Sequence, residues 1–481
     1  MLQQITKNMV SLAFLQILAK VCILIFMIII TPALGPELMG VYGYLLNLII
    51  IFDIVIDYGM MPYMVKAIAN NRENSRAYFF HPLVIKYSLA IVSSIAIMLY
   101  GYTIEPDPIK RNAYDTVIMI LFTWPLFNSV ITIFQAYERQ DLYGFIYVIR
   151  NGVLIIITYF LLMFGLKVEA PLFGYAFSAL TAALVGVFWL RKRFFLPYAK
   201  ETAVTHSVKT IARQGFPFFI TALIICLYTR IDVIVLSWLR GNVETGLFKT
   251  SQQTLEGLAI VNFVVGNTIY PVLSRIASTN NNHFDTILKK SIKLLFLLCF
   301  PAAVLFTTAG RELIGLFYGI EQFSGSVIAL QILVWQYIPY SINYVNLYTL
   351  YALNLQKKVV IVNSAGLIIK TVIFVLFSLK AGYVGGCWAV VISECLMVFI
   401  YWISTRKYIH YGLFQKDNIL TIIISVGMLG SIMLLKYIFS GWAAVFLGCI
   451  FYGAGVFLFK IITVSEVKAL YKTILDKQSS I

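Results

Sequence analysis

Long apolar stretches alternate with short polar connections along the whole chain. Fourteen of these stretches approach or exceed the roughly 18 apolar residues that a helix needs to cross a bilayer. The connections are too short to hold a soluble domain, so the sequence predicts an all-α polytopic membrane protein. The expected membrane-spanning helices are 8–31, 39–65, 81–102, 116–137, 142–164, 170–190, 214–239, 246–272, 291–310, 326–353, 359–379, 383–405, 418–435 and 441–463.

Lysine and arginine are distributed unequally between the two sets of connections. If the N-terminus is cytoplasmic, 24 of the 37 basic residues fall on the cytoplasmic side and only seven on the other. This asymmetry follows the positive-inside rule, so both termini are expected in the cytoplasm. It also accounts for most of the net charge of +16 without a nucleic-acid partner. The seven outer residues are Lys110, Arg111, Lys167, Arg240, Arg311, Lys380 and Lys436.

Eleven acidic or basic residues lie inside the predicted spans when Lys293 and Lys460, each within three residues of a cytoplasmic span end, are counted with the cytoplasmic connections. A charge within hydrocarbon costs a few kcal/mol, so such residues usually face a cavity or a partner. Lys86 is the residue we most expect to reach the membrane surface instead. The basic residues are Lys20, Lys86, Arg150, Arg230, Lys249 and Lys370. The acidic residues are Asp53, Asp57, Asp232, Glu256 and Glu394.

Composition argues against an enzyme and against a resident cofactor. All six cysteines lie in apolar spans, which disfavours a disulfide framework. The four histidines lie in or beside cytoplasmic connections and lack metal-ligand spacing, so no metal site is expected. The chain carries no P-loop, no dinucleotide fingerprint and no nucleophile elbow. ATP hydrolysis is therefore not expected. The first span is too long for a signal peptide and should be retained.

The sequence also indicates an internal duplication. Residues 1–205 and 206–410 match in order at four places, each copy containing six spans. An even number of spans makes the copies parallel repeats, with a substrate site expected where they meet. Residues 411–481 add two spans and a cytoplasmic tail. The matched places are Leu34–Tyr42 with Leu239–Phe248, Pro62–Lys66 with Pro271–Arg275, Ala136–Gln140 with Ala352–Gln356, and Trp189–Lys192 with Trp402–Lys407.

Motifs near the N-terminus resemble one transporter family. They are Lys7-Asn8 through Gln16, Thr31-Pro32 through Val41-Tyr42, Asp57-Tyr58-Gly59, and Lys66-Ala67-Ile68-Ala69-Asn70-Asn71-Arg72. Together they resemble the polysaccharide repeat-unit flippases (Wzx-like) of the multidrug/oligosaccharidyl-lipid/polysaccharide exporter (MOP) superfamily. Lys66 departs from the pattern, in which arginine is more usual. The resemblance implies two pseudo-symmetric six-helix bundles plus two C-terminal helices, an arrangement that is MATE-like.

The resemblance also implies a cargo and a location. Members move undecaprenyl-pyrophosphate-linked oligosaccharides across the bacterial cytoplasmic (inner) membrane, for surface polymers such as O-antigen, lipopolysaccharide or capsule. Coupling to H⁺ or Na⁺ and contact with polysaccharide polymerase machinery are implied as well, and a monomer is expected to function. The multidrug or cation antiporters of the same superfamily are the main alternative. A lipid II flippase and a membrane-embedded glycan polymerase or ligase are further ones, although the outer connections are too short for the catalytic loop that a polymerase needs.

The pyrophosphate and the sugars need a polar path lined by cations. Lys249, Gln252, Gln253 and Glu256 share one helical face, which predicts a cavity lining. The predicted substrate-binding residues are Lys20, Arg150, Arg230, Lys249, Gln252, Gln253 and Lys370. The candidates for ion coupling are Asp53, Asp57, Asp232, Glu256 and Glu394. Structural pairing is the alternative for most of these residues, in particular Lys20 with Asp53 or Asp57, and Lys249 with Glu256.

Overall fold

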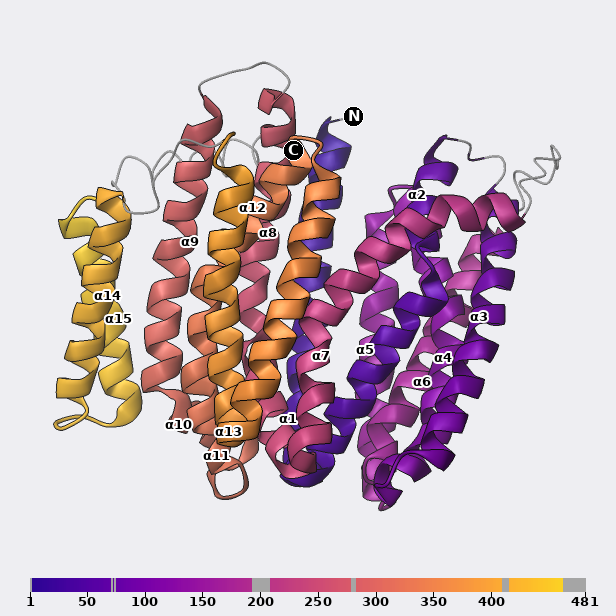
Figure 1. Cartoon of the computed structure of the whole chain (residues 1–481), viewed down its shortest axis with the longest axis horizontal. Helices are drawn as coiled ribbons and strands as arrows, with labels where there is room; N and C mark the ends of the chain where they lie inside the picture. The colour runs from indigo at the N-terminus through magenta and orange to yellow at the C-terminus, as the bar shows by residue number, and fades with distance from the viewer. Residues whose placement is uncertain are drawn as a thin grey trace. The chain divides into compact units, whose positions relative to one another are not determined.

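The computed structural model describes residues 2–70, 72, 75–192, 208–277, 283–408 and 415–461, and every regular element in these ranges is a helix (Figure 1). Within these ranges, eleven helical segments are long and apolar enough to cross a membrane. The chain is therefore a multi-pass membrane protein of the all-α class, as predicted. It divides into two compact units, residues 1–246 and 247–481, which are described separately.

Three of the eleven segments each contain two of the predicted spans. The chain reverses inside them at Gly35 (φ 69°, ψ 173°), Gly241 (φ 76°, ψ −171°) and Gly382 (φ 60°, ψ −148°). Only glycine adopts this backbone region without strain. Two spans can therefore be joined with almost no loop between them. These reversals reconcile eleven continuous segments with fourteen predicted spans.

Unit 1 is built from α1 to α6 and the first part of α7. Its core joins apolar residues from all of these helices, with α6 packed on α4 and α5, and α1 packed on α3, α4 and α5. The helices are α1 Leu2–Asp57, α2 Met60–Asn70, α3 Ser75–Thr103, α4 Pro108–Ala136, α5 Gln140–Met163, α6 Glu169–Leu190 and α7 Val208–Leu255.

Unit 2 contains the rest of α7 and the remaining helices. Within it, α12 packs on α8, α9 and α13, while α14 and α15 pack on each other and on α9 (Figure 1). The elements are the 3₁₀ turns η4 Glu256–Leu258 and η5 Val334–Gln336, and the helices α8 Ala259–Ala277, α9 His283–Thr308, α10 Gly310–Tyr318, α11 Ile320–Leu333, α12 Tyr337–Ala352, α13 Gln356–Thr405, α14 Lys416–Leu435 and α15 Gly441–Leu458.

Three predicted spans are interrupted in the structure. The second breaks at Tyr58 and Gly59, both with positive φ, which separates α2 from α1. The eighth passes through the 3₁₀ turn η4, and the tenth is made of α11, η5 and α12. The short helix α10 was not predicted. Hydropathy alone does not reveal such breaks, because the residues on both sides remain apolar.

Backbone conformation repeats at two of the four matched places, and also at the turn between the fifth and sixth spans of each copy. Gly35 and Gly241 share nearly the same φ and ψ, as given above. The turn after α4 has Glu138 at φ 58°, and the turn after α12 has Asn354 at φ 57°, with matching hydrogen bonds around them. Gly165 and Gly382 both turn with positive φ between the fifth and sixth spans of their copies. The repeats 1–205 and 206–410 stay a prediction, and their boundary lies outside the described residues.

Candidate functional site

Two acidic residues near the end of α1 take different partners from neighbouring helices. Lys86 of α3 is fully buried, and its Nζ lies 2.8 Å from Oδ1 of Asp57. Asn128 of α4 donates to both carboxylate oxygens of Asp53, at 3.0 and 3.2 Å. We call these four residues the acidic–basic cluster. The expectation that Lys86 reaches the membrane surface is wrong, because a carboxylate inside the bundle pairs with its charge.

Lys20 stands apart from this cluster. Its side chain is exposed, while the carboxylates of Asp53 and Asp57 are bound by Asn128 and Lys86. The alternative in which Lys20 pairs with either acid is therefore not the arrangement in this structure. The expectation that Lys20 binds the substrate stays a prediction. The side chains of Asn8 and Gln16, which share its span, lie outside the described residues.

Arg150 of α5 is surrounded by aromatic rings. Its guanidinium carbon lies 5.2 Å from the Trp124 ring centre, 4.7 Å from Phe127 and 5.7 Å from Tyr175. The three rings, the aromatic cage, come from α4 and α6 and are themselves buried. Cation–π attraction of this kind is strongest where water is excluded. Arg150 therefore does not extend to the interface, although it lies near the start of its span.

The aromatic cage contains donors that lack acceptors. Nε of Arg150 and Nε1 of Trp124 are buried and have no hydrogen-bond partner among the described residues. A buried donor without an acceptor costs about 1–3 kcal/mol. The charge of Arg150 also acts on Asp53, together with those of Asp57 and Lys86. The cage and the acidic–basic cluster thus form one polar region inside an apolar unit, with unused capacity to bind an anion or a hydroxyl.

The first part of α7 brings two more predicted residues to unit 1. Asp232 is only 2% exposed, and Arg230 is half-buried. The thiol of Cys226, one turn earlier, is influenced by the charges of both Arg230 and Asp53, so the predicted residues of α1 and α7 lie in the same neighbourhood. The sequence alone does not show this proximity, because the residues are far apart along the chain.

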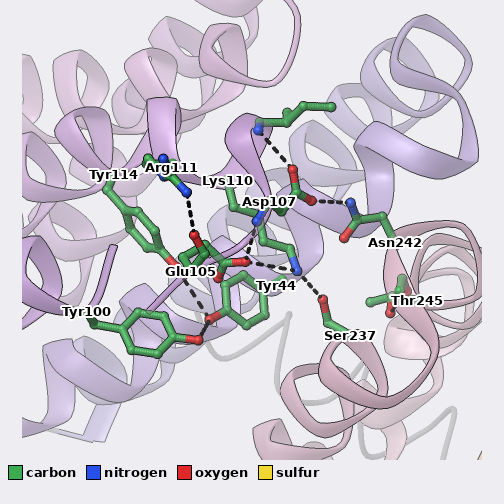
Figure 2. Close-up of polar contacts among 12 residues, drawn as sticks. Tyr44, Tyr100, Glu105, Asp107, Lys110, Arg111, Tyr114, Ser237, Asn242 and Thr245 are labelled. Carbon is green, nitrogen blue, oxygen red and sulfur yellow. Dashed lines mark hydrogen bonds and ion pairs between the residues drawn. The ribbon is translucent and has the colours of Figure 1, made fainter. Parts of the chain in front are cut away.

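A polar cluster that was not predicted lies where α3 meets α4 (Figure 2). Lys110 donates to the Ser237 hydroxyl at 2.8 Å, lies over the Tyr44 ring at 4.5 Å and is 4.0 Å from Glu105. Asn242 donates to Asp107 at 2.5 Å. The charged residues between Glu105 and Arg111 could have indicated this cluster in the sequence. Lys110 and Arg111 were assigned to a connection on the outer side instead. We call this group the α3–α4 end cluster.

Glycines let α1 and α7 approach closely beside the α3–α4 end cluster. A Cβ at Gly40 would overlap the carbonyl oxygen of Asn242, and one at Gly246 would overlap that of Pro36. At the other end, a Cβ at Gly59 would overlap the carbonyl oxygen of Gly215. The backbone of α7 therefore touches α1 at one end and the turn between α1 and α2 at the other, which only glycine permits.

In unit 2, the predicted polar face of α7 forms the expected pair. Lys249 is 1% exposed, and its Nζ lies 3.8 Å from Oε1 of Glu256. Gln252 and Gln253 are half-buried, and the amide oxygen of each has no hydrogen-bond partner in the described ranges. The face thus offers one paired cation and two unused acceptors. This geometry fits both predicted alternatives for Lys249 and Glu256: lining a substrate cavity, or pairing only to stabilise the helix bundle.

The remaining predicted residues lie on α13. Glu394 is 4% exposed and accepts from Asn343 of α12 at 2.9 Å, through Oε2. Lys370 is equally buried, on the other side of the reversal at Gly382. Within the residues searched, no group of three or more His, Cys, Asp or Glu side chains could hold a metal ion.

An open cavity of about 470 Å³ lies at the α2 end of unit 1. It is lined by Tyr63, Lys66, Ala67, Asn70, Tyr78, Gln214 and Phe218. Three of these belong to the motif Lys66–Arg72 that carries the family resemblance. The motif therefore borders this opening through Lys66, Ala67 and Asn70, while Ile68 is buried in the apolar core.

Comparison with known proteins identifies the class. Residues 5–277 match the family model described as "Polysaccharide biosynthesis protein", and the chain belongs to that family. A "Putative O-antigen transporter" from Escherichia coli (strain K12) is 22% identical over 376 residues, covering 76% of this chain and 88% of the relative. The resemblance found in the sequence is thus confirmed.

Solved structures show the same fold. One is titled "Lipid II flippase MurJ, inward closed conformation", with a TM-score of 0.77 and 14% identity over 94% of this chain and 98% of that one. Another is an inward-facing multidrug resistance MATE family transporter of the MOP superfamily, with a TM-score of 0.70 and 15% identity over 81% and 94%. The predicted MATE-like fold class is therefore confirmed. The relatives are transporters and flippases, in agreement with the expectation that the chain is not an enzyme.

Proposed function

We propose that this protein is a flippase that moves undecaprenyl-pyrophosphate-linked oligosaccharide repeat units across the cytoplasmic membrane by alternating access, for surface polysaccharide biosynthesis. The observation that carries the proposal is Arg150 in its aromatic cage, within the membrane-spanning part of a polysaccharide biosynthesis protein. A guanidinium with an unpartnered Nε suits a phosphate oxygen, because charge-assisted bonds to phosphate are strong and directional.

The polar groups of such a cargo determine what the protein must supply. The polyprenyl tail can remain in lipid, whereas the pyrophosphate and the sugars cannot cross hydrocarbon unaided. Arg150 and Arg230 in unit 1, Lys249 with Gln252 and Gln253 in unit 2, and the exposed Lys20 and buried Lys370 are the proposed binding residues. Rings of the aromatic cage offer flat apolar faces to sugars beside the cation.

Acidic residues are proposed to couple transport to an ion gradient. Asp53 and Asp57 lie one helical turn apart and compete for the positive charge of Lys86. Two close carboxylates favour uptake of a proton or another small cation, since like charges resist joint ionisation. H⁺ and Na⁺ both fit this arrangement. Asp232, Glu256 and Glu394 are further candidates.

The orientation follows from charge. With the N-terminus in the cytoplasm, most basic connections face that side, which places the α3–α4 end cluster on the outer side. The bacterial inner membrane is the proposed location, with both termini cytoplasmic and polysaccharide polymerase machinery as the downstream partner. A monomer is the proposed functional unit.

A multidrug or cation antiporter is the second candidate, because MATE transporters share the fold. Cationic drugs require acidic sites without a neighbouring cation. In unit 1 the buried Lys86 and the half-buried Arg150 lie beside the acids, which favours an anionic cargo.

Reconstitution tests the proposal. The purified protein is placed in vesicles containing undecaprenyl pyrophosphate linked to an oligosaccharide, and a glycosidase added outside reports the exposed leaflet. The proposal predicts that the inner-leaflet pool becomes accessible with the wild type and at least tenfold more slowly with Arg150→Ala. Arg191→Ala, at the end of α6, is the matched control and should behave as the wild type. Equal rates with and without wild-type protein would contradict the proposal.

A further inference from the structure

Five tyrosines form a continuous stripe along α12. This helix lies outside the part of the chain that matches the family model, and none of the predicted charged residues lies on it. They are Tyr337, Tyr340, Tyr344, Tyr348 and Tyr351, spaced by three or four residues, so they share one helical face. Successive ring centres are 6.1, 5.8, 5.0 and 6.2 Å apart. The hydroxyls of Tyr344 and Tyr348 lie 3.4 Å apart. We call these residues the tyrosine stripe.

The tyrosine stripe reaches the middle of the membrane, a position that is unusual for tyrosine. At 1.5 Å per residue it extends about 21 Å, and the predicted span 326–353 has its centre near Tyr340. Membrane tyrosines normally gather at the two interfaces. Phenol hydroxyls at mid-depth are costly if they face lipid, because hydrocarbon offers no hydrogen bonds. The rings from Tyr340 to Tyr351 are nonetheless only half-buried. The stripe is therefore expected to border a polar space.

Helix α8 supplies the second side of this surface. A Cβ at Gly266 would contact the rings of Tyr344 and Tyr348 at 2.5 to 3.0 Å, and Tyr270 lies 5.7 Å from Tyr348. Asn262, Gly266 and Tyr270 are each four residues apart and so lie on one face of α8. The face that carries Asn262 is thus the face that meets the tyrosine stripe.

Asn262 is an independent sign of a ligand. It is 1% exposed, and neither its amide nitrogen nor its amide oxygen has a hydrogen-bond partner among the described residues. A buried amide with both atoms unused is rare and costly. It offers a donor and an acceptor together, which matches a hydroxyl or acetamido group better than a phosphate or a metal ion.

We infer that the tyrosine stripe, with Asn262, is the binding surface for the neutral sugar rings of the cargo. This inference rests on the proposed function and assigns a further part of the glycan-binding surface to unit 2. Tyrosine rings stack on the apolar faces of pyranoses while their hydroxyls bond to sugar hydroxyls. No formal charge lies on the stripe, so it recognises sugars rather than pyrophosphate. It begins near mid-membrane and ends at the 353–355 turn, on the side proposed to be cytoplasmic, where the glycan would enter.

Binding measurements separate the glycan from its carrier. The protein in nanodiscs is titrated with bare undecaprenyl pyrophosphate and with undecaprenyl pyrophosphate bearing a neutral tetrasaccharide. Tyr344→Leu and Tyr348→Leu should each weaken binding of the glycosylated carrier by about fivefold, with unchanged affinity for the bare carrier. Tyr344→Phe should stay within about twofold of the wild type. Tyr437→Leu, an exposed tyrosine after α14, is the control and should change neither affinity.

Footprinting of the wild type tests the same point without a substitution that could disturb folding. Hydroxyl-radical labelling should be reduced at Tyr340, Tyr344 and Tyr348 by the glycosylated carrier but not by the bare one. Equal protection by both, no protection, or leucine variants that weaken both affinities equally would overturn the inference while leaving the flippase proposal intact. A wild type that binds neither carrier would overturn both.

Discussion

The Nζ atom of Lys86 lies 2.8 Å from Oδ1 of Asp57, joining α3 to the end of α1 inside the bundle. Among the described residues neither atom has a hydrogen-bond partner, so the contact is an ion pair and not an aligned hydrogen bond. Buried ion pairs contribute little net stability, yet removing one partner is costly because the other charge is left unpaired. Its small expected net stability is compatible with the role in ion coupling that we propose for Asp57.

Asp57→Asn should destabilise the protein by about 3–5 kcal/mol, since Lys86 would remain charged and buried. Thermal unfolding in detergent measures this change. The double variant Asp57→Asn with Lys86→Met should unfold near the wild-type temperature but transport poorly. A single variant as stable as the wild type would show that Lys86 does not depend on Asp57. Full transport by the double variant would limit the pair to a structural role.

The pair Asp53 and Asp57 should determine how transport depends on pH. Replacing both by asparagine, with Lys86→Gln to avoid an orphaned charge, removes the carboxylates that would bind the coupling ion. The variant is expected to lose the response of transport to external pH in vesicles with an imposed gradient. Asp417→Asn, whose carboxylate pairs with Lys293 between α9 and α14, is the control. A pH profile identical to that of the wild type would remove Asp53 and Asp57 from coupling.

Lys249→Ala should reduce export of surface glycan at least tenfold while the protein still inserts and accumulates normally. The reason is the loss of a buried cation on the polar face shared with Gln252 and Gln253. Surface polymer and protein level in complemented cells provide the measurement. Lys293→Ala is the matched control, because Lys293 pairs with Asp417 away from that face. Normal polymer at normal expression would contradict the cavity role of Lys249.

Gly40→Val should prevent the close approach of α1 and α7 beside the α3–α4 end cluster, because a Cβ there overlaps the carbonyl oxygen of Asn242. A cysteine placed at the buried Ser237, in a background lacking the native cysteines, reports the change through an impermeant maleimide added to cells. Labelling should rise severalfold. Gly152→Ala, where a Cβ meets no neighbour within 4 Å, should leave labelling unchanged. Unchanged labelling with Gly40→Val would show that this contact does not close the outer end.

The sequence predicted the spans well because hydropathy and span length are local properties. It also placed Lys249 and Glu256 on one face correctly, since helical periodicity is local too. The partners of Lys86 and Arg150 were not predictable, because they depend on which helix faces meet in three dimensions. Lys86 lies near the end of its span, which suggested that it reaches the membrane surface. In the structure, α3 packs against α1 and buries Lys86 beside Asp57. The tyrosine stripe was not predicted, because its significance depends on the contacts that its mid-membrane rings make with α8.

The central claim is that lipid-linked repeat units cross the membrane through this protein. Deleting its gene and assaying the leaflet of extracted undecaprenyl-linked glycans tests that claim most directly. The proposed function predicts that complete repeat units accumulate facing the cytoplasm and that surface polymer disappears, with recovery on complementation. Intact surface polymer together with raised sensitivity to cationic drugs would contradict it and would favour the antiporter.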